Sequence, residues 1–199
     1  MATRTQAREV VAQLLYAYGS GNDGIAKFVD EILSEQKIKN AQSAFAKSLF
    51  NGVLEELDAL DLRIKHQIKN WDFERIGDME RAILRLGAYE IIFSKTERAI
   101  VINEALEITK NFSNEASTKF INGILDGIAN NATMSLEDIK EALQESQKEE
   151  QVVRSVNNAP KEKFFKNRKD YKTGARRQNT PSVKAVSAKK HFTIKKTGK

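Results

Sequence analysis

Apolar residues recur at helical spacing along most of the first 130 positions of the chain. From Ala7 they fall three and four positions apart as far as Tyr18, and the glycine-rich stretch Gly19–Gly24 then interrupts the pattern. The same spacing predicts a short helix over 25–33 and a longer one over 41–60. Because no window alternates apolar and polar residues for long enough to require a sheet, the pattern predicts an all-α body.

The pattern continues with a second group of helices. A helical piece reaches about residue 69, and Gly77-Asp78 opens a helix that runs through Phe93 with Asp78 as its expected N-cap. Two further helices are predicted over 102–111 and 113–130.

One short string occurs in the middle of two of these helices. Asn51-Gly52 and Asn122-Gly123 are each followed by a β-branched residue, a leucine and an acidic residue. A glycine inside a helix costs about 0.5–1 kcal/mol relative to alanine, so it is favoured where two helices approach closely. We therefore expect Gly52 and Gly123 to occupy equivalent packing positions in two similar three-helix bundles, joined around residues 61–77.

Charge divides the chain into three parts, although the net charge of the whole is only +6. Residues 1–133 hold 16 basic and 19 acidic side chains, residues 134–150 hold two and six, and residues 151–199 hold fifteen and two. Ser135 and Asp138 fit a capping box at the start of a further helix. We predict a helical domain over 1–133, an acidic helical extension over 134–150 that either docks on the body or acts as a spacer, and a basic tail over 151–199.

The basic tail lacks hydrophobic periodicity and contains both prolines of the chain. Its composition predicts disorder in the free protein. Basic groups alternate with aromatic ones, which favours binding to the phosphates and bases of RNA over a purely solvated tail. The aromatic and histidine side chains of this tail are Phe164, Phe165, Tyr171, His191 and Phe192.

Few residues offer catalytic or metal-binding chemistry. The chain has no cysteine, and its two histidines, His66 and His191, lie in different segments. Gly19–Gly24 matches G-x-G-x-x-G, but a helix precedes it where dinucleotide binding requires a strand. The carboxylates lie on predicted solvent faces. We therefore expect neither an enzyme nor a cofactor or metal site.

The chain begins without the apolar run of a secretory signal, and no apolar stretch approaches the roughly 20 residues that span a bilayer. We expect a cytoplasmic protein without membrane contact. The single tryptophan, Trp71, precedes a helix boundary, and we interpret it as a half-buried packing anchor rather than a stacking platform.

Four strings of the chain stand out together. They are Ala7-Arg8-Glu9 with Gln13-Leu14-Leu15-Tyr16, the segment 80–90 (ERAILRLGAYE), the segment 101–107 (VINEALE) and the segment 119–126 (KFINGILD). In order and spacing they resemble the NusB family of bacterial transcription antitermination factors, over about residues 3–130. The resemblance implies an all-α fold of two three-helix bundles.

The resemblance also implies a function. A member of this family would bind the boxA element of nascent RNA together with NusE, a small-subunit ribosomal protein. Within the RNA polymerase antitermination complex, the pair would help hold the polymerase in a termination-resistant state, mainly on ribosomal RNA operons. Carried over by position, the RNA-binding candidates are Arg4, Arg8, Tyr16, Lys119 and Phe120. Arginines would hold phosphates while an aromatic ring stacks on an unpaired base.

For NusE, the family pattern points to Glu74 and Glu80, with Arg85 and Tyr89 as weaker candidates. An acidic patch suits a basic ribosomal partner. At the N-terminus, where the family often carries consecutive arginines, this chain has two that are separated, Arg4 and Arg8. We therefore expect the basic tail to restore the RNA affinity that this segment has lost.

Two alternative functions stay open: a helical protein-interaction module with a nonspecific tail, and the recognition subunit of an RNA-modifying enzyme. Homodimerisation stays open.

Overall fold

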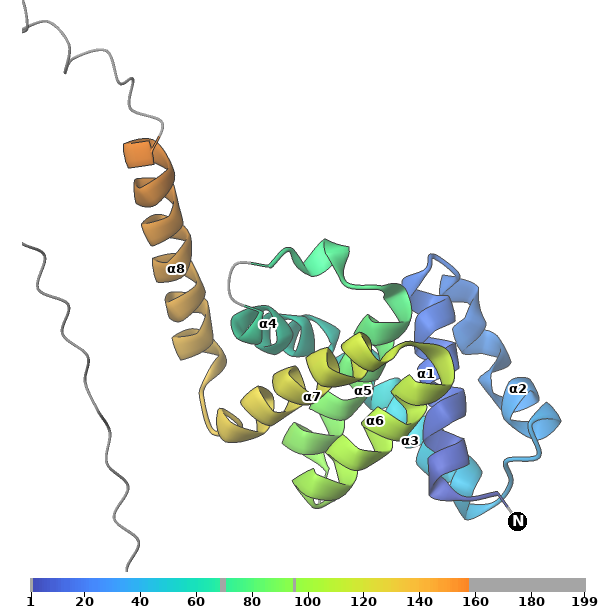
Figure 1. Ribbon diagram of the computed structural model, residues 1–199. Coiled ribbons are helices and arrows are strands. Elements are labelled where there is room, and N and C mark those ends of the chain that lie inside the picture. The colour runs from blue at the N-terminus through green and yellow to red at the C-terminus, as the bar shows by residue number, and fades with distance from the viewer. Residues whose placement is uncertain (1, 69–70, 95, 158–199) are drawn as a thin grey trace, which may run out of the picture. The chain divides into compact units, whose positions relative to one another are not determined.

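The protein is a helical body followed by a long last helix (Figure 1). The computed structural model describes residues 2–68, 71–94 and 96–157, and residues 149–157 are described by their backbone alone. No strand occurs in these ranges, so the all-α prediction is confirmed there. The basic tail expected from 151 lies outside them from residue 158 onward. The elements are α1 (Arg4–Gly19), η1 (Asp23–Phe28), α2 (Val29–Glu35), α3 (Ala41–Glu55), α4 (Leu57–Gln67), η2 (Phe73–Arg75), α5 (Asp78–Phe93), α6 (Arg98–Phe112), α7 (Glu115–Asn130) and α8 (Leu136–Asn157).

Local capping explains where several of these helices begin. The Thr3 hydroxyl accepts the N–H of Gln6 while the Gln6 side chain accepts the N–H of Thr3, so α1 starts at Arg4, three residues before its apolar pattern does. Asn114 caps α7 with a single hydrogen bond, in which its side-chain oxygen accepts the N–H of Ser117. Gly77, and not the expected Asp78, is the N-cap residue of α5.

Two of the predicted helices are divided differently in the structure. The apolar run over 25–33 forms a 3₁₀ helix, η1, followed by α2. The single helix expected over 41–60 is two helices that meet at Glu56. The break turns Leu60 and Ile64 of α4 into the core, where both are fully buried.

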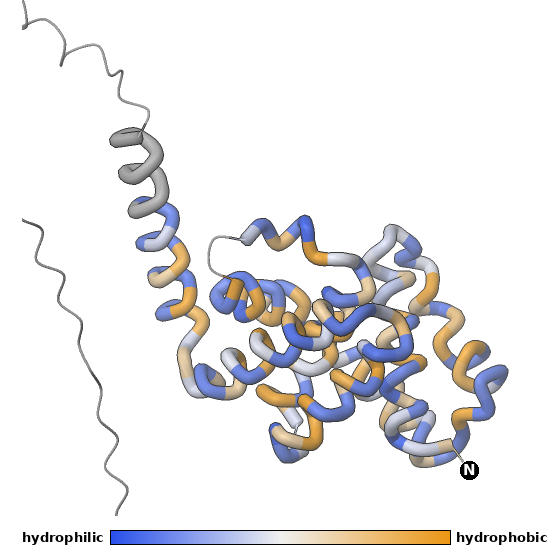
Figure 2. Tube along the Cα trace, viewed as in Figure 1, coloured by the Kyte–Doolittle hydropathy of each residue, from blue (hydrophilic) through white to orange (hydrophobic). Residues whose placement is uncertain are grey.

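Helix α5 lies at the centre of the body. It packs against α1, α3 and α4 from the first half of the chain and against α6 and α7 from the second. The buried side chains of all these helices form one continuous hydrophobic cluster. Figure 2 shows hydrophobic and hydrophilic positions following one another along the helices of the body. The expected division into two three-helix bundles is not confirmed, because α1 packs on α5 as extensively as it packs on α3.

The first turns of α8 dock on the body. The side chain of Ile139 is 1% exposed, and the Arg63 guanidinium donates a hydrogen bond of 3.2 Å to the carbonyl oxygen of Met134. The N–H of Asp138 donates to the Ser135 hydroxyl, as the capping-box pattern predicts. The helix continues past the expected boundary at Glu150 to Asn157.

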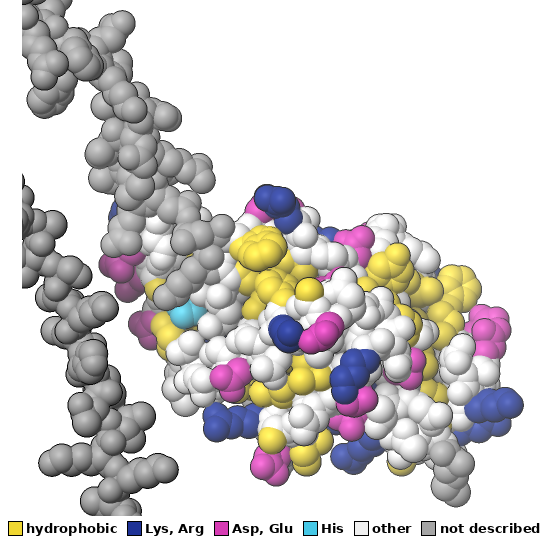
Figure 3. Space-filling view, in the orientation of Figure 1, with side chains coloured by type: hydrophobic (Ala, Val, Ile, Leu, Met, Phe, Trp, Pro, Cys, Tyr) yellow, Lys and Arg dark blue, Asp and Glu magenta, His cyan; other side chains and the backbone are white. Residues whose placement is uncertain are grey.

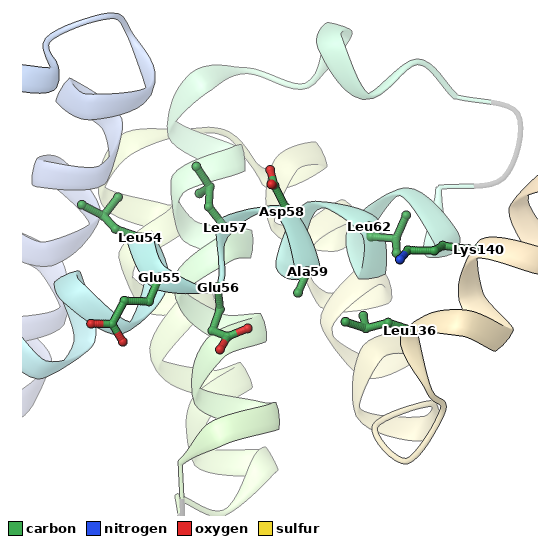
Figure 4. A pocket seen from close by; sticks show the side chains of 9 residues that line it. All are labelled: Leu54, Glu55, Glu56, Leu57, Asp58, Ala59, Leu62, Leu136 and Lys140. Carbon is green, nitrogen blue, oxygen red and sulfur yellow. The ribbon is translucent and has the colours of Figure 1, made fainter.

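An open groove of about 480 Å³ runs between α8 and the junction of α3 and α4 (Figure 4). Figure 4 shows Leu136 and Lys140 reaching toward Leu62 from the α8 side. The other lining residues are Leu54, Glu55, Glu56, Leu57, Asp58 and Ala59.

Candidate nucleic-acid interface

Arg4 and Arg8 lie one helical turn apart on α1 and both lie over the Phe45 ring of α3, but their exposure and ion pairing differ. The Arg4 guanidinium lies over the Phe45 ring of α3, 4.9 Å from its centroid, in an exposed side chain. Arg8 is only 4% exposed. Its Nε and Nη2 atoms donate hydrogen bonds of 2.8 Å to the two carboxylate oxygens of Glu90 on α5.

The Arg8–Glu90 pair joins α1 to the central helix. Glu104 of α6 adds a second carboxylate, with its Oε2 atom 3.5 Å from Arg8 Nη1. Burial lowers the pKa of Arg8, because it disfavours the charged guanidinium. The hydrogen bonds and negative charge of Glu90, together with the negative charge of Glu104, have the larger combined effect and raise that pKa above its ordinary value. A phosphate would have to displace these carboxylates to reach the guanidinium, and the RNA contact expected of Arg8 stays a prediction.

The remaining RNA candidates lie at the surface. Tyr16 is 42% exposed on α1, about 18 Å along the helix axis from Arg4. Lys119 and Phe120 lie on the second turn of α7. The Lys119 ammonium, on a side chain that is 78% exposed, pairs at 2.8 Å with the equally exposed Glu115, a contact that costs little to break. Phe120 is half-buried against the core.

Trp71 is a surface residue that the sequence interpretation misassigned. Its side chain is 59% exposed, so it is not a half-buried anchor. Its ring packs on Phe120 at 5.8 Å between centroids and 48° between planes. On the face seen in Figure 3, hydrophobic side chains form a patch between the segment that carries η2 and α7. Only the fold could reveal this contact, because the two residues are 49 positions apart.

The first turns of α5 and α7 are joined through Glu80. Ser113 and Ser117 both donate to its Oε1 atom, at 2.6 and 2.8 Å. Partial burial disfavours the carboxylate, but these two hydrogen bonds and one from the backbone outweigh it and lower the pKa of Glu80. Glu80 therefore acts as a structural link between helices and also stays ionised near neutral pH.

The other three protein-binding candidates each contact different residues of the body. Glu74 is exposed and pairs with Arg81 at 3.0 Å. The Arg85 guanidinium donates two hydrogen bonds, of 2.7 and 2.8 Å, to Asp61 of α4. Tyr89 packs against α3 and stacks on Phe93 at 5.3 Å. Of the four, only Glu74 and Arg85 share a feature, an open groove of about 370 Å³ at the end of α1.

The two Asn-Gly strings occupy different environments, contrary to the expectation of equivalent packing. A Cβ atom on Gly52 would collide with the Tyr89 hydroxyl and ring, so this glycine permits the close approach of α3 and α5. A Cβ atom on Gly123 would meet no atom of the described residues within 4 Å.

Some absences hold for the described part of the chain. There, no cluster of three His, Asp or Glu side chains is placed to bind a metal ion. In the same ranges, no helix has both the length and the apolar character to cross a membrane.

The chain matches the model of the NusB family over residues 5–130. It belongs to the NusB family. "Transcription antitermination protein NusB" of Wolinella succinogenes is 56% identical over 128 residues, which cover 64% of this chain and 95% of that protein. The protein of the same name from Helicobacter pylori is 53% identical over 133 residues, covering 67% and 96%.

Solved structures agree with the family assignment. NusB of T. maritima aligns with a TM-score of 0.62 at 30% identity, covering 72% of this chain and 98% of that one. A structure described as antitermination factors NusB and NusE in complex with double-stranded RNA aligns with a TM-score of 0.58, also at 30% identity, over 64% and 96%. The names of these NusB-family proteins describe transcription antitermination, which is a regulatory and not an enzymatic activity.

Proposed function

We propose that this protein is a transcription antitermination factor that binds boxA-containing RNA together with NusE. The observation that carries the proposal is the NusB-family match over residues 5–130, which spans the whole helical body up to α8. The similar structure that holds NusB with NusE and RNA supports both partner classes. Action on nascent RNA within the RNA polymerase antitermination complex would place the protein in the cytoplasm.

The proposed RNA surface consists of Arg4, Tyr16, Lys119 and Phe120. Two cations can neutralise phosphates and two rings can stack on unpaired bases. With only Arg4 accessible at the start of α1, the charged contribution of the body is small, and the basic tail is expected to add nonspecific affinity. For NusE, the proposed contacts are Glu74 and Glu80, with Arg85 and Tyr89 as weaker candidates.

A binding experiment on the full chain tests the proposal. Affinity for a boxA-containing RNA and for a scrambled RNA is measured over a salt series, with and without NusE. We expect a preference for boxA that increases when NusE is added. Equal and steeply salt-dependent binding to both RNAs, with no effect of NusE, would contradict the proposal and favour a helical interaction module with a nonspecific tail. Light scattering on the same samples measures self-association.

A further inference from the structure

Trp71 is exposed and yet held in place. Its indole has the largest exposed fraction among the exposed large hydrophobic side chains of the described residues. The backbone N–H of Trp71 donates a hydrogen bond of 2.9 Å to the carbonyl oxygen of Ile68. Phe73 and Ile76, which follow shortly in the chain, are buried. The backbone at Trp71 is thus tied to Ile68 and to the buried residues that follow, and the ring itself lies against Phe120.

The contact with Phe120 extends the proposed RNA surface beyond α7. Phe120 packs partly against the core, whereas the Trp71 ring leans on it at 48° and stays mostly exposed. The two rings therefore form one aromatic surface that begins at α7 and ends at the segment before η2. Exposed aromatic faces are the main stacking sites for unpaired bases in proteins that bind single-stranded nucleic acids.

The surroundings of this aromatic pair suit a sugar–phosphate chain. Lys119, next to Phe120, offers an exposed ammonium that pairs with the exposed carboxylate of Glu115. Gly123 lies one turn after Phe120 on α7, and the space where its side chain would be is open. Because no described residue lies against this glycine, the helix backbone is accessible there to a ligand. The nearby Asp72 carboxylate is occupied as a cap, accepting the Glu74 N–H at 3.0 Å.

We propose that Trp71 is a stacking platform for an unpaired base of single-stranded RNA, with Gly123 admitting the RNA backbone beside Phe120. This inference rests on the proposed RNA-binding function and adds two residues to it. RNA is favoured over a protein as the occupant, because the exposed ammonium of Lys119 borders the aromatic pair and attracts a phosphate.

The chain carries its own probe for this proposal, because Trp71 is its only tryptophan. Unlabelled single-stranded RNA is titrated into the full-length protein while Trp emission is recorded, and binding is followed in parallel by the anisotropy of labelled RNA. We expect emission to fall with the same midpoint as the anisotropy change, and acrylamide to quench the bound protein less than the free one. Each signal reports burial of the indole by RNA.

Substitutions separate stacking from apolar contact. W71A and W71L should both weaken RNA binding about tenfold, whereas W71F, which keeps an aromatic face, should stay within about threefold of the wild type. Phe28→Ala is the matched control, because Phe28 is 53% exposed on η1, and it should leave affinity unchanged. G123L, which fills the open face of α7, should also weaken binding. Thermal unfolding of each variant checks that the fold is retained.

The outcomes distinguish this proposal from the function on which it rests. If RNA changes the anisotropy but not the Trp emission, and W71A binds as the wild type does, Trp71 is not a stacking platform and the RNA function stands. If emission changes only when NusE is added, Trp71 contacts the protein partner and the inference is overturned. If the wild type binds no RNA at all, both proposals fail.

Discussion

Arg8 and Glu90 form a bidentate ion pair in the core, with two hydrogen bonds of 2.8 Å between helices that are 82 positions apart in sequence. The side chains of Arg8 and Glu90 are 5% and 2% exposed, respectively. Such a pair fixes how α1 sits on α5, and it holds in the core the arginine that the family resemblance names as an RNA contact.

We expect Arg8→Ala to destabilise the protein by about 3–5 kcal/mol, because it leaves the Glu90 carboxylate buried without its partner. The double variant R8M/E90L removes both charges and should recover most of that loss. Urea unfolding followed by circular dichroism measures both. A stable Arg8→Ala protein with strongly reduced RNA affinity would instead establish Arg8 as an RNA contact.

The two Asn-Gly strings provide a matched pair of substitutions. Gly52→Ala should destabilise the protein by about 1–3 kcal/mol, because the new methyl group collides with the Tyr89 ring and hydroxyl. Gly123→Ala should stabilise it by about 0.5–1 kcal/mol, since the methyl group meets open space and the helix gains propensity. Thermal unfolding of the two variants compares them. Equal effects at the two glycines would contradict the packing described for α3 and α5.

Glu80 should contribute to a pH dependence of stability. Its pKa is lowered in the folded state, so its contribution is fully present above the ordinary value of about 4.5 and is lost as the pH falls through the lowered folded value. E80Q should therefore be less stable than the wild type at neutral pH, and the difference should shrink on acidification below pH 4.5. Urea unfolding at a series of pH values measures this.

The control for Glu80 is the double variant S113A/S117A, which removes the two hydroxyl donors and keeps the carboxylate. It should raise the pKa of Glu80 and move the loss of stability to higher pH. A difference between E80Q and wild type that is constant with pH would argue against the lowered pKa.

Removing residues 158–199 should separate nonspecific from specific RNA binding. The truncation keeps α8 to its end at Asn157 and deletes 14 of the 15 basic residues of the predicted tail. RNA affinity and its slope against salt concentration should both fall, because fewer phosphates are neutralised. The preference for boxA over a scrambled RNA should persist. Unchanged affinity would show that the tail takes no part in RNA binding.

Several features follow from the sequence because they depend on neighbours in the chain. Apolar spacing predicts most of the helices, and the Ser135–Asp138 pattern predicts the start of α8 to within a residue. The four family strings are local as well, and they identify the family that the match over 5–130 confirms. The resemblance also supplies the RNA and NusE candidates, which stay predictions.

The environment of each residue was decided by tertiary packing. Arg4 and Arg8 look alike in sequence, yet Arg8 pairs with carboxylates of α5 and α6, which lie far along the chain. Gly52 and Gly123 share a local string, but only Gly52 has a tyrosine against it. Trp71 is exposed because Phe73 and Ile76 take the neighbouring core positions. Helical propensity is a property of a segment, whereas burial and pairing depend on which segments meet.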